Sequence, residues 1–486
     1  MSNARTVCLL LAVLIALAAG VCFAQESETF DEAIAAYDQG NHEKARKLFE
    51  QVLAERPDHP VVLCWMGTAS LQIGELSKAE EYLTRALEQK SDYPVAHNNL
   101  GNVYLAQGKL SQAKRHYEKA ISQDNSYADA HFNLANLYTR QKEWDAAFNE
   151  FNRALEYSPD DFDIHTNFGH ALAQAGLTDK ALREYRAAQK LQPTDPHPLT
   201  MLGMLYVKKG DYASAADAYQ KAVDIDPDLL DAQLGLGVSL YNQGEYEKAV
   251  APLTKAAELA PNNFAAHYDL GLAHAAVGNV SAAEQAYRTA LKIKPDDENC
   301  LNNLGWVLQQ DGRPEEAIEP LEKAVELQPD SAMAYINLAL AYEQAGSSQD
   351  ALNIWKTAAE KFRNNPDAQF GLANSYYAAG NKDRALSQYL RALAIKDDNA
   401  EAHHNVGLIY LERSNYAEAA SHFQAALKYQ PNFANAANNL GVALERQNDI
   451  DGARQMYRKA LEIDPECAPA KKNLDRLAPA GETATG

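Results

Sequence analysis

Histidine is the side chain in this sequence with the widest choice of chemistry, because it can transfer protons or bind metal ions near neutral pH. Five of the 13 histidines are separated by multiples of 34 residues. A zinc ligand must lie within about 2.1 Å of the metal. A spacing of 34 residues is long enough for a pair of helices, so residues that recur at this spacing lie on separate helices, roughly 8–10 Å apart. We therefore expect packing roles, and no metal site, for these five: His97, His131, His165, His267 and His403.

Signatures of catalysis do not occur in the sequence. We find no GxxxxGK[ST] phosphate loop, no HExxH zinc motif and no GxSxG nucleophile turn. Acid pairs such as Asp449 with Asp451, or Glu315 with Glu316, fall at turns and early in expected helices, where carboxylates stabilise the helix dipole. We predict that the protein is not an enzyme and holds no metal or cofactor.

Asparagines recur with the same 34-residue period. A side-chain amide both donates and accepts hydrogen bonds, so a row of amides can hold a peptide backbone without reading its sequence. The alternative is that these amides bond to the protein itself or to water, as most polar side chains do. The candidate backbone-binding ladder consists of Asn99, Asn133, Asn167, Asn303, Asn337, Asn405 and Asn439.

A 34-residue repeat must position all of these side chains. We number its places from Pro196, which is place 1 of the copy PHPLTMLGMLYVKKGDYASAADAYQKAVDIDPDL, and count thirteen copies between residues 26 and 467. Place 8 is always Gly or Ala and place 20 is always Ala, so two helices can approach closely there. Gly at place 15 in ten copies and Pro at place 32 in nine end the two helices. Each copy is therefore predicted to be a helix hairpin.

The residues Leu202, Gly203, Tyr206, Ala215 and Pro227 stand at the spacing of the tetratricopeptide repeat, which this unit resembles. The resemblance covers residues 26–467. It implies an all-α fold, a right-handed superhelical α-solenoid of antiparallel helix hairpins, whose first helices line a concave groove. In the family such grooves bind proteins or peptides.

An apolar stripe follows the arc of the first helix that faces away from the second helix. At 100° per residue, this arc holds places 2, 5, 9, 12 and 13, and the resemblance puts it in the groove. Apolar residues there indicate a surface for an extended peptide or a partner helix, although they could instead lean into the seam between repeats. The candidates are Leu234, Tyr241, Tyr268, Leu272, Trp306, Ile336, Leu340, Phe370 and Tyr377.

Two relatives sharpen these expectations. The asparagine ladder is similar to the one in the repeat superhelix of O-linked N-acetylglucosamine transferases, which implies backbone binding, although we expect no catalytic domain beside these repeats. Some chaperone-binding relatives hold acidic tails with a clamp of Lys and Asn. No Lys or Arg stands at place 2, 5 or 9 of any copy here, so we expect no preference for acidic tails.

The ends of the chain differ from the repeats. Residues 1–24 carry Arg5, a long uncharged apolar run and a small residue before Gln25, which predicts a cleaved signal peptide and a periplasmic or secreted protein. The alternatives are an uncleaved membrane anchor formed by residues 7–23 and a lipid on Cys22. The repeats and a capping helix (468–477) occupy 25–477, and a disordered tail is expected at 478–486.

The formal net charge of −21 disfavours nucleic acid and anionic membrane surfaces as partners, because both recruit Lys and Arg. Membrane contact is expected only if the leader is uncleaved or lipidated. We predict an exported scaffold that binds a protein or peptide along the groove. The alternative is the non-catalytic arm of a glycosyltransferase or of a polysaccharide-export complex. The sequence leaves the oligomeric state open.

Overall fold

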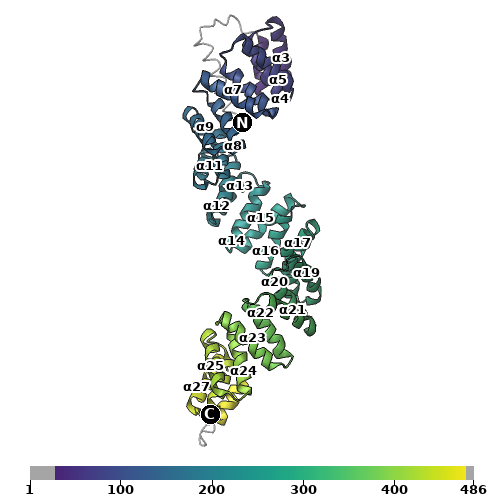
Figure 1. Cartoon of the computed structure of the whole chain (residues 1–486), viewed down its shortest axis with the longest axis vertical. Helices are drawn as coiled ribbons and strands as arrows, with labels where there is room; N and C mark the ends of the chain where they lie inside the picture. The colour runs from purple at the N-terminus through teal and green to yellow at the C-terminus, as the bar shows by residue number, and fades with distance from the viewer. Residues whose placement is uncertain (1–27, 478–486) are drawn as a thin grey trace. The chain divides into compact units, whose positions relative to one another are not determined.

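The computed structural model describes residues 28–477, which are all-α (Figure 1). The predicted signal peptide (1–24) and the predicted tail (478–486) lie outside the described residues. Within the described range, no helix combines the length and the apolar character needed to cross a membrane.

The described residues form 27 helices in two compact units, which meet in the sequence after Gly244 and are described separately. No change of composition marks this boundary, and it was not predicted. The helices of the first unit are α2 (Glu28–Asp38), α3 (His42–Glu55), α4 (Pro60–Gln72), α5 (Leu76–Gln89), α6 (Pro94–Ala106), α7 (Leu110–Gln123), α8 (Ala128–Gln141), α9 (Trp144–Tyr157), α10 (Phe162–Gln174), α11 (Thr178–Leu191), α12 (His197–Lys208), α13 (Tyr212–Ile225) and α14 (Leu230–Asn242).

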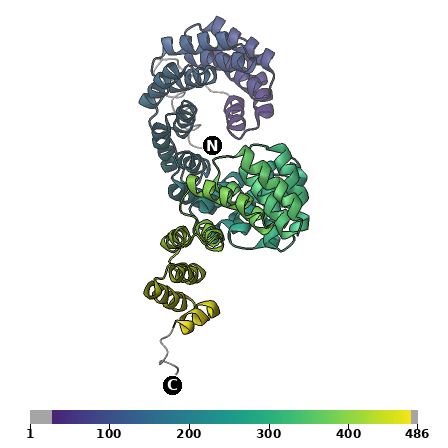
Figure 2. The ribbon, with the colours of Figure 1, turned by 60° about the horizontal axis from the view of Figure 1, so that its bottom comes forward.

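The second unit continues the same alternation of helices and short turns. Its helices are α15 (Tyr246–Leu259), α16 (Phe264–Ala276), α17 (Val280–Ile293), α18 (Glu298–Gln310), α19 (Pro314–Leu327), α20 (Ala332–Gln344), α21 (Ser348–Lys361), α22 (Pro366–Ala378), α23 (Lys382–Ile395), α24 (Ala400–Glu412), α25 (Tyr416–Tyr429), α26 (Ala434–Arg446), α27 (Ile450–Ile463) and α28 (Ala468–Arg476). Consecutive helices pack as antiparallel pairs, which confirms the predicted fold class. Figure 2 shows such pairs side by side in the purple and blue part of the chain.

Alanine at place 20 lies on the second helix of every pair. The side chain of every one of these alanines is fully buried, as the small-residue pattern predicted. Any larger residue would push the helices apart. The alanines are Ala45, Ala79, Ala113, Ala147, Ala181, Ala215, Ala249, Ala283, Ala317, Ala351, Ala385, Ala419 and Ala453.

Glycine at place 8 makes room for a large side chain at place 24 of the second helix. A Cβ atom added to Gly101 would lie 2.5 Å from the ring of Tyr117, and one added to Gly441 would lie 2.6 Å from the ring of Tyr457. Tyr117 and Tyr457 are fully buried. The ring therefore fills the space that the missing side chain leaves, and Tyr117 joins a continuous core that runs from α2 to α14.

The turn between paired helices requires a left-handed residue at place 15. Glycine supplies it in ten copies, for example Gly108 with φ 75°. Three residues other than glycine have positive φ in the described part of the chain, and all three stand at place 15. They are Lys142, Ser414 and Asn448, with φ of 60°, 61° and 68°. Side chains with a Cβ are strained in this region, Asn least, so the geometry of the turn prevails over residue preference there.

Candidate partner-binding surface

Exposed large apolar side chains lie on two first helices of the second unit, α18 and α20, and half-buried ones follow on α22; α20 contacts both other helices. The exposed fraction is 41% for Trp306 and 36% for Leu340, although both are large and apolar. Ile336, Phe370 and Tyr377 are half-buried. Trp306 and Leu340 thus lie on the open arc of their helices, where the stripe was predicted.

Met333 belongs to the same surface and was missed by the sequence reasoning. It is 59% exposed, more than any other large apolar residue of the described chain. On α20, Met333, Ile336 and Leu340 follow one another at intervals of three and four residues, so they share one face of the helix. Place 2, where Met333 stands, had been assigned to the open arc, and this assignment could have identified it. We call Trp306, Met333, Ile336, Leu340, Phe370 and Tyr377 the α18–α22 stripe.

The half-buried candidates also contribute to the core. Ile336 packs against the cluster around Trp355, and Phe370 and Tyr377 pack against the cluster around Tyr389. The ring centroids of Phe370 and Tyr389 are 5.8 Å apart. Part of each of these three side chains therefore contributes to the core, and part remains accessible.

The remaining candidates lie outside this cluster of exposed residues. Tyr268 and Leu272 on α16 are half-buried and pack against the core that contains Tyr287. Leu234 and Tyr241 on α14 are half-buried and belong to the first unit. The structure thus divides the predicted residues between the two units.

The asparagines of the predicted ladder donate hydrogen bonds within the protein. In five cases the Nδ2 atom reaches the residue 35 positions earlier, which is place 5 of the preceding repeat. The distances to the acceptor atoms are 2.9 Å for Asn133 to Asn98 and for Asn337 to Asn302, 3.0 Å for Asn439 to His404, 3.3 Å for Asn303 to Tyr268 and 3.9 Å for Asn99 to the Cys64 sulfur.

The two exceptions depend on the residue at place 5. Where place 5 of the preceding repeat is Phe, it offers no acceptor, and the asparagine turns elsewhere. Asn167 donates to its own helix, to the Asp163 carbonyl at 2.8 Å, and Asn405 donates to the Tyr389 hydroxyl at 3.1 Å. The amides thus bond to place 5 of the preceding repeat wherever that place offers an acceptor atom. The sequence did not reveal this, because the 35-residue offset reflects how adjacent repeats are packed.

Four of the five histidines at place 4 contact the residue at place 23 of the second helix in their own hairpin. His131 Nδ1 lies 2.6 Å from Glu150 Oε2, and His165 Nδ1 lies 2.8 Å from Glu184 Oε2. In both rings Nε2 lies 3.0–3.1 Å from a backbone carbonyl oxygen six residues earlier. Both nitrogens of each ring thus face hydrogen-bond acceptors.

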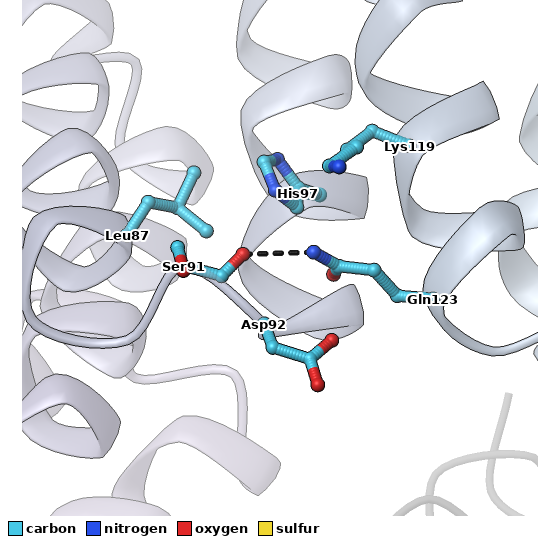
Figure 3. A pocket seen from close by; sticks show the side chains of 6 residues that line it. All are labelled: Leu87, Ser91, Asp92, His97, Lys119 and Gln123. Atoms are coloured by element: carbon cyan, nitrogen blue, oxygen red, sulfur yellow. Dashed lines mark hydrogen bonds between the residues drawn. The ribbon is translucent and has the colours of Figure 1, made fainter.

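In two other repeats a second histidine replaces the glutamate. The Nδ1 atoms of His97 and His116 are 3.1 Å apart, and those of His403 and His422 are 3.0 Å apart. Burial lowers the pKa of His116 to about 4, and burial also lowers the pKa of His97 and that of His422. Burial thus disfavours the charged form of His97, His116 and His422. His97 also lines an open pocket with Ser91, Asp92, Lys119 and Gln123 (Figure 3).

The acids considered for chemistry have ordinary structural partners. Asp449 caps α27 by accepting the Gly452 N–H at 2.9 Å, and Glu316 pairs with Arg313 at 2.7 Å. Between residues 28 and 477, no group of three or more His, Cys, Asp or Glu is arranged to hold a metal ion. The three cysteines in that range are free and buried.

Comparison with known proteins identifies repeats along both units. Tetratricopeptide-repeat family models match residues 36–103, residues 101–142 and 135–176, and residues 339–401 and 407–466. A model of the C-terminal domain of cilia and flagella-associated protein 70 matches residues 161–369. A search of curated proteins gave no match.

Solved structures of repeat proteins are similar to parts of the chain. MamA is 30% identical over 33% of this chain and 95% of its own, with a TM-score of 0.32. YrrB, described as a TPR protein with an unusual peptide-binding site, is 26% identical over 38% of this chain and 95% of its own, with a TM-score of 0.33. A tetratricopeptide repeat protein from Parabacteroides merdae is 20% identical over 51% of this chain and 98% of its own, with a TM-score of 0.41. Repeat spacing, paired helices and family models agree, and the chain belongs to the tetratricopeptide-repeat family of protein-interaction scaffolds.

Proposed function

We propose that the second unit binds an apolar protein segment on the α18–α22 stripe. The observation that carries this proposal is the joint exposure of Trp306, Met333 and Leu340, at 41%, 59% and 36%. Side chains of this size on adjacent helices cost free energy when they face water, and binding would recover it. Trp is also among the residues that most often dominate binding energy at interfaces.

Charged residues near the stripe indicate which charges the partner should carry. Glu343, Asp367 and Glu401 are exposed on α20, α22 and α24, and the open arc carries no Lys or Arg at places 2, 5 and 9. A partner with acidic residues beside its apolar ones would meet like charge, whereas Lys or Arg would meet opposite charge. The proposed partner is therefore an apolar segment flanked by basic residues.

The asparagine ladder remains part of the proposal for residues next to the stripe. Asn303 is half-buried and uses Nδ2 in one bond to the preceding repeat, whereas Asn337 is buried and is left out of the proposal. An amide nitrogen carries two hydrogens, so one bond leaves a second donor. A bound segment could take that donor with its backbone carbonyls, while the stripe holds its side chains.

Selection of displayed random peptides tests the proposal. The wild-type chain should enrich peptides that combine apolar residues with Lys or Arg. A Trp306→Ala and Met333→Ser double variant should weaken binding of the enriched peptides at least tenfold with unchanged circular dichroism. Met204→Ser is a matched control, because Met204 is 51% exposed on α12 of the first unit. Equal binding by the double variant, or enrichment of acidic peptides, would contradict the proposal.

Export is a separate proposal that rests on residues 1–24 alone. Amino-terminal sequencing of the protein from its native cells should find Gln25 as the first residue if the leader is cleaved. An intact leader would favour the membrane anchor formed by residues 7–23.

A further inference from the structure

The two histidine pairs share one geometry in different units of the chain. His97 and His116 stand at places 4 and 23 of one hairpin, and His403 and His422 stand at the same places of another. The expectation that histidines at place 4 bind no metal considered only other copies of place 4. It did not consider place 23, which lies 19 residues away in the sequence but faces place 4 across the hairpin.

The protonation of the His403 ring follows from its contacts. Its Nε2 atom lies 3.0 Å from the carbonyl oxygen of Asp397 and 3.2 Å from the Oδ1 atom of Asp397. Both are acceptors, so Nε2 carries the hydrogen, and in the singly protonated ring Nδ1 presents a lone pair. The Nδ1 atom of His422 must then donate to it across the 3.0 Å contact.

The separation of the two nitrogens suits chelation. Metal–nitrogen bonds of about 2.0–2.1 Å place neighbouring ligands about 2.8–3.0 Å apart at a right angle and about 3.3–3.4 Å apart at the tetrahedral angle. The observed separations of 3.0 and 3.1 Å fall between these values. A metal ion could therefore replace the shared hydrogen with small movements of the rings, while the His422 proton moves to Nε2 or to solvent.

We infer that each histidine pair binds one divalent transition-metal ion through its two Nδ1 atoms, with water molecules completing the coordination. Imidazole nitrogen suits zinc, copper and nickel, and among these copper binds most tightly. The hydrogen bond from His403 Nε2 to Asp397 is the outer-shell contact that typically orients a metal-binding histidine. His116 and His422 are half-buried, so part of each ring faces solvent.

The charges near each histidine pair predict which pair binds a metal ion more tightly. Asp397 places a carboxylate beside His403. The positive charge of Arg115 acts on His116, and that of Lys119 acts on His97, where Asp92 only partly offsets it. Because nearby positive charge opposes a cation, the pair in α24 and α25 should bind more tightly than the pair in α6 and α7.

The chain contains its own controls. His131 and His165 occupy the same place, but each presents both nitrogens to oxygen acceptors. Their Nδ1 atoms carry hydrogens held by Glu150 and Glu184, so neither ring offers a free lone pair. Exposed histidines elsewhere would bind metal singly and weakly.

The experiment is a calorimetric Zn²⁺ titration of the full chain, freed of any histidine tag, at pH 7.5. Two sites per chain are expected. His422→Gln and His116→Gln should each remove one site, or weaken it at least tenfold, because glutamine can still donate to the facing Nδ1 but cannot replace the imidazole ligand. His131→Gln should leave both sites intact. Circular dichroism checks that the variants fold.

Electron paramagnetic resonance with Cu²⁺ identifies the ligands. The Cu²⁺ spectrum of the wild type should show splitting from two imidazole nitrogens. A reduction of this splitting in the His422→Gln variant would support the site in α24 and α25. Zinc stoichiometry unchanged by both glutamine variants, or loss of binding in His131→Gln instead, would overturn the inference and leave only adventitious binding by surface histidines.

Discussion

Asn337 Nδ2 donates to Asn302 Oδ1 at 2.9 Å, and this bond joins place 6 of one repeat to place 5 of the repeat before it. The same offset recurs in both units, for example between Asn133 and Asn98. Solenoid repeats contact only their neighbours, so such bonds act directly on the stability of the junctions between repeats. The asparagines thus have a structural role whether or not they also bind a partner.

Replacing Asn337 by Ala should loosen the junction between α18 and α20. The side chain is buried, and its removal leaves the Asn302 amide oxygen without this donor. The expected loss is about 1 kcal/mol, which corresponds to about fivefold faster hydrogen exchange in these two helices. Mass spectrometry of exchanged peptides measures it.

Asn167→Ala is the matched control, because Asn167 donates to its own helix at 2.8 Å and makes no bond of this kind to the preceding repeat. It should leave exchange in the preceding repeat unchanged. Equal effects of the two substitutions would show that the bond between repeats contributes no stability.

The hairpins could be predicted from the sequence, whereas several contacts across them could not. Gly at places 8 and 15 and Ala at place 20 are required by the local geometry of a helix hairpin, so their recurrence predicts paired helices. The position of Trp306 on the open arc was predicted from helical periodicity. The contact of His403 with His422 and that of Asn337 with Asn302 depend on how far one helix is shifted along its neighbour. No local pattern encodes that shift.

Lys142→Gly should stabilise the turn between α8 and α9. Lys142 has φ 60°, in the left-handed region that glycine occupies in ten other copies. Relief of the Cβ strain is partly offset by the greater freedom of glycine in the unfolded chain, so the expected gain is about 0.5–1 kcal/mol. Thermal denaturation measures the change.

Further substitutions at place 15 test whether relief of backbone strain causes the gain in stability. Ser414→Gly should give a similar gain and Asn448→Gly a smaller one, because Asn tolerates positive φ. The reverse change, Gly108→Lys, should destabilise the chain. A loss of stability in Lys142→Gly would show that the lysine side chain matters more than the backbone strain.

Glu184 should make part of the stability depend on pH. Burial alone would lower the pKa of His165, but the hydrogen bonds to the Glu184 carboxylate and to the Pro159 carbonyl outweigh it and raise the pKa. A raised pKa in the folded state gives stability that is fully present below pH 6.5 and is lost as pH rises through the folded pKa. Glu184→Gln should remove this dependence, and the histidine signals in NMR titrations should show the pKa of His165 fall. An unchanged pKa would exclude Glu184 as the cause.

Asp269→Asn should stabilise the second unit at neutral pH. Asp269 stands at place 6, where seven other copies have Asn, and burial raises the pKa of its carboxyl to about 6. Because the folded state disfavours the charge, ionised Asp269 costs stability above pH 6, and the cost shrinks as pH falls toward the unfolded pKa. The expected gain from Asn is about 2–3 kcal/mol at pH 7 and about 1 kcal/mol near pH 4.5.

Urea denaturation of the variant and the wild type at the two pH values measures this difference. Glu401→Gln is the control, since Glu401 is exposed and its neutralisation should change stability by less than about 0.5 kcal/mol at either pH. A gain from Asp269→Asn that is equal at both pH values would mean that the amide stabilises by a new hydrogen bond. A loss at pH 7 would mean that the carboxylate is held by a favourable contact, and burial would then not be the cause of its raised pKa.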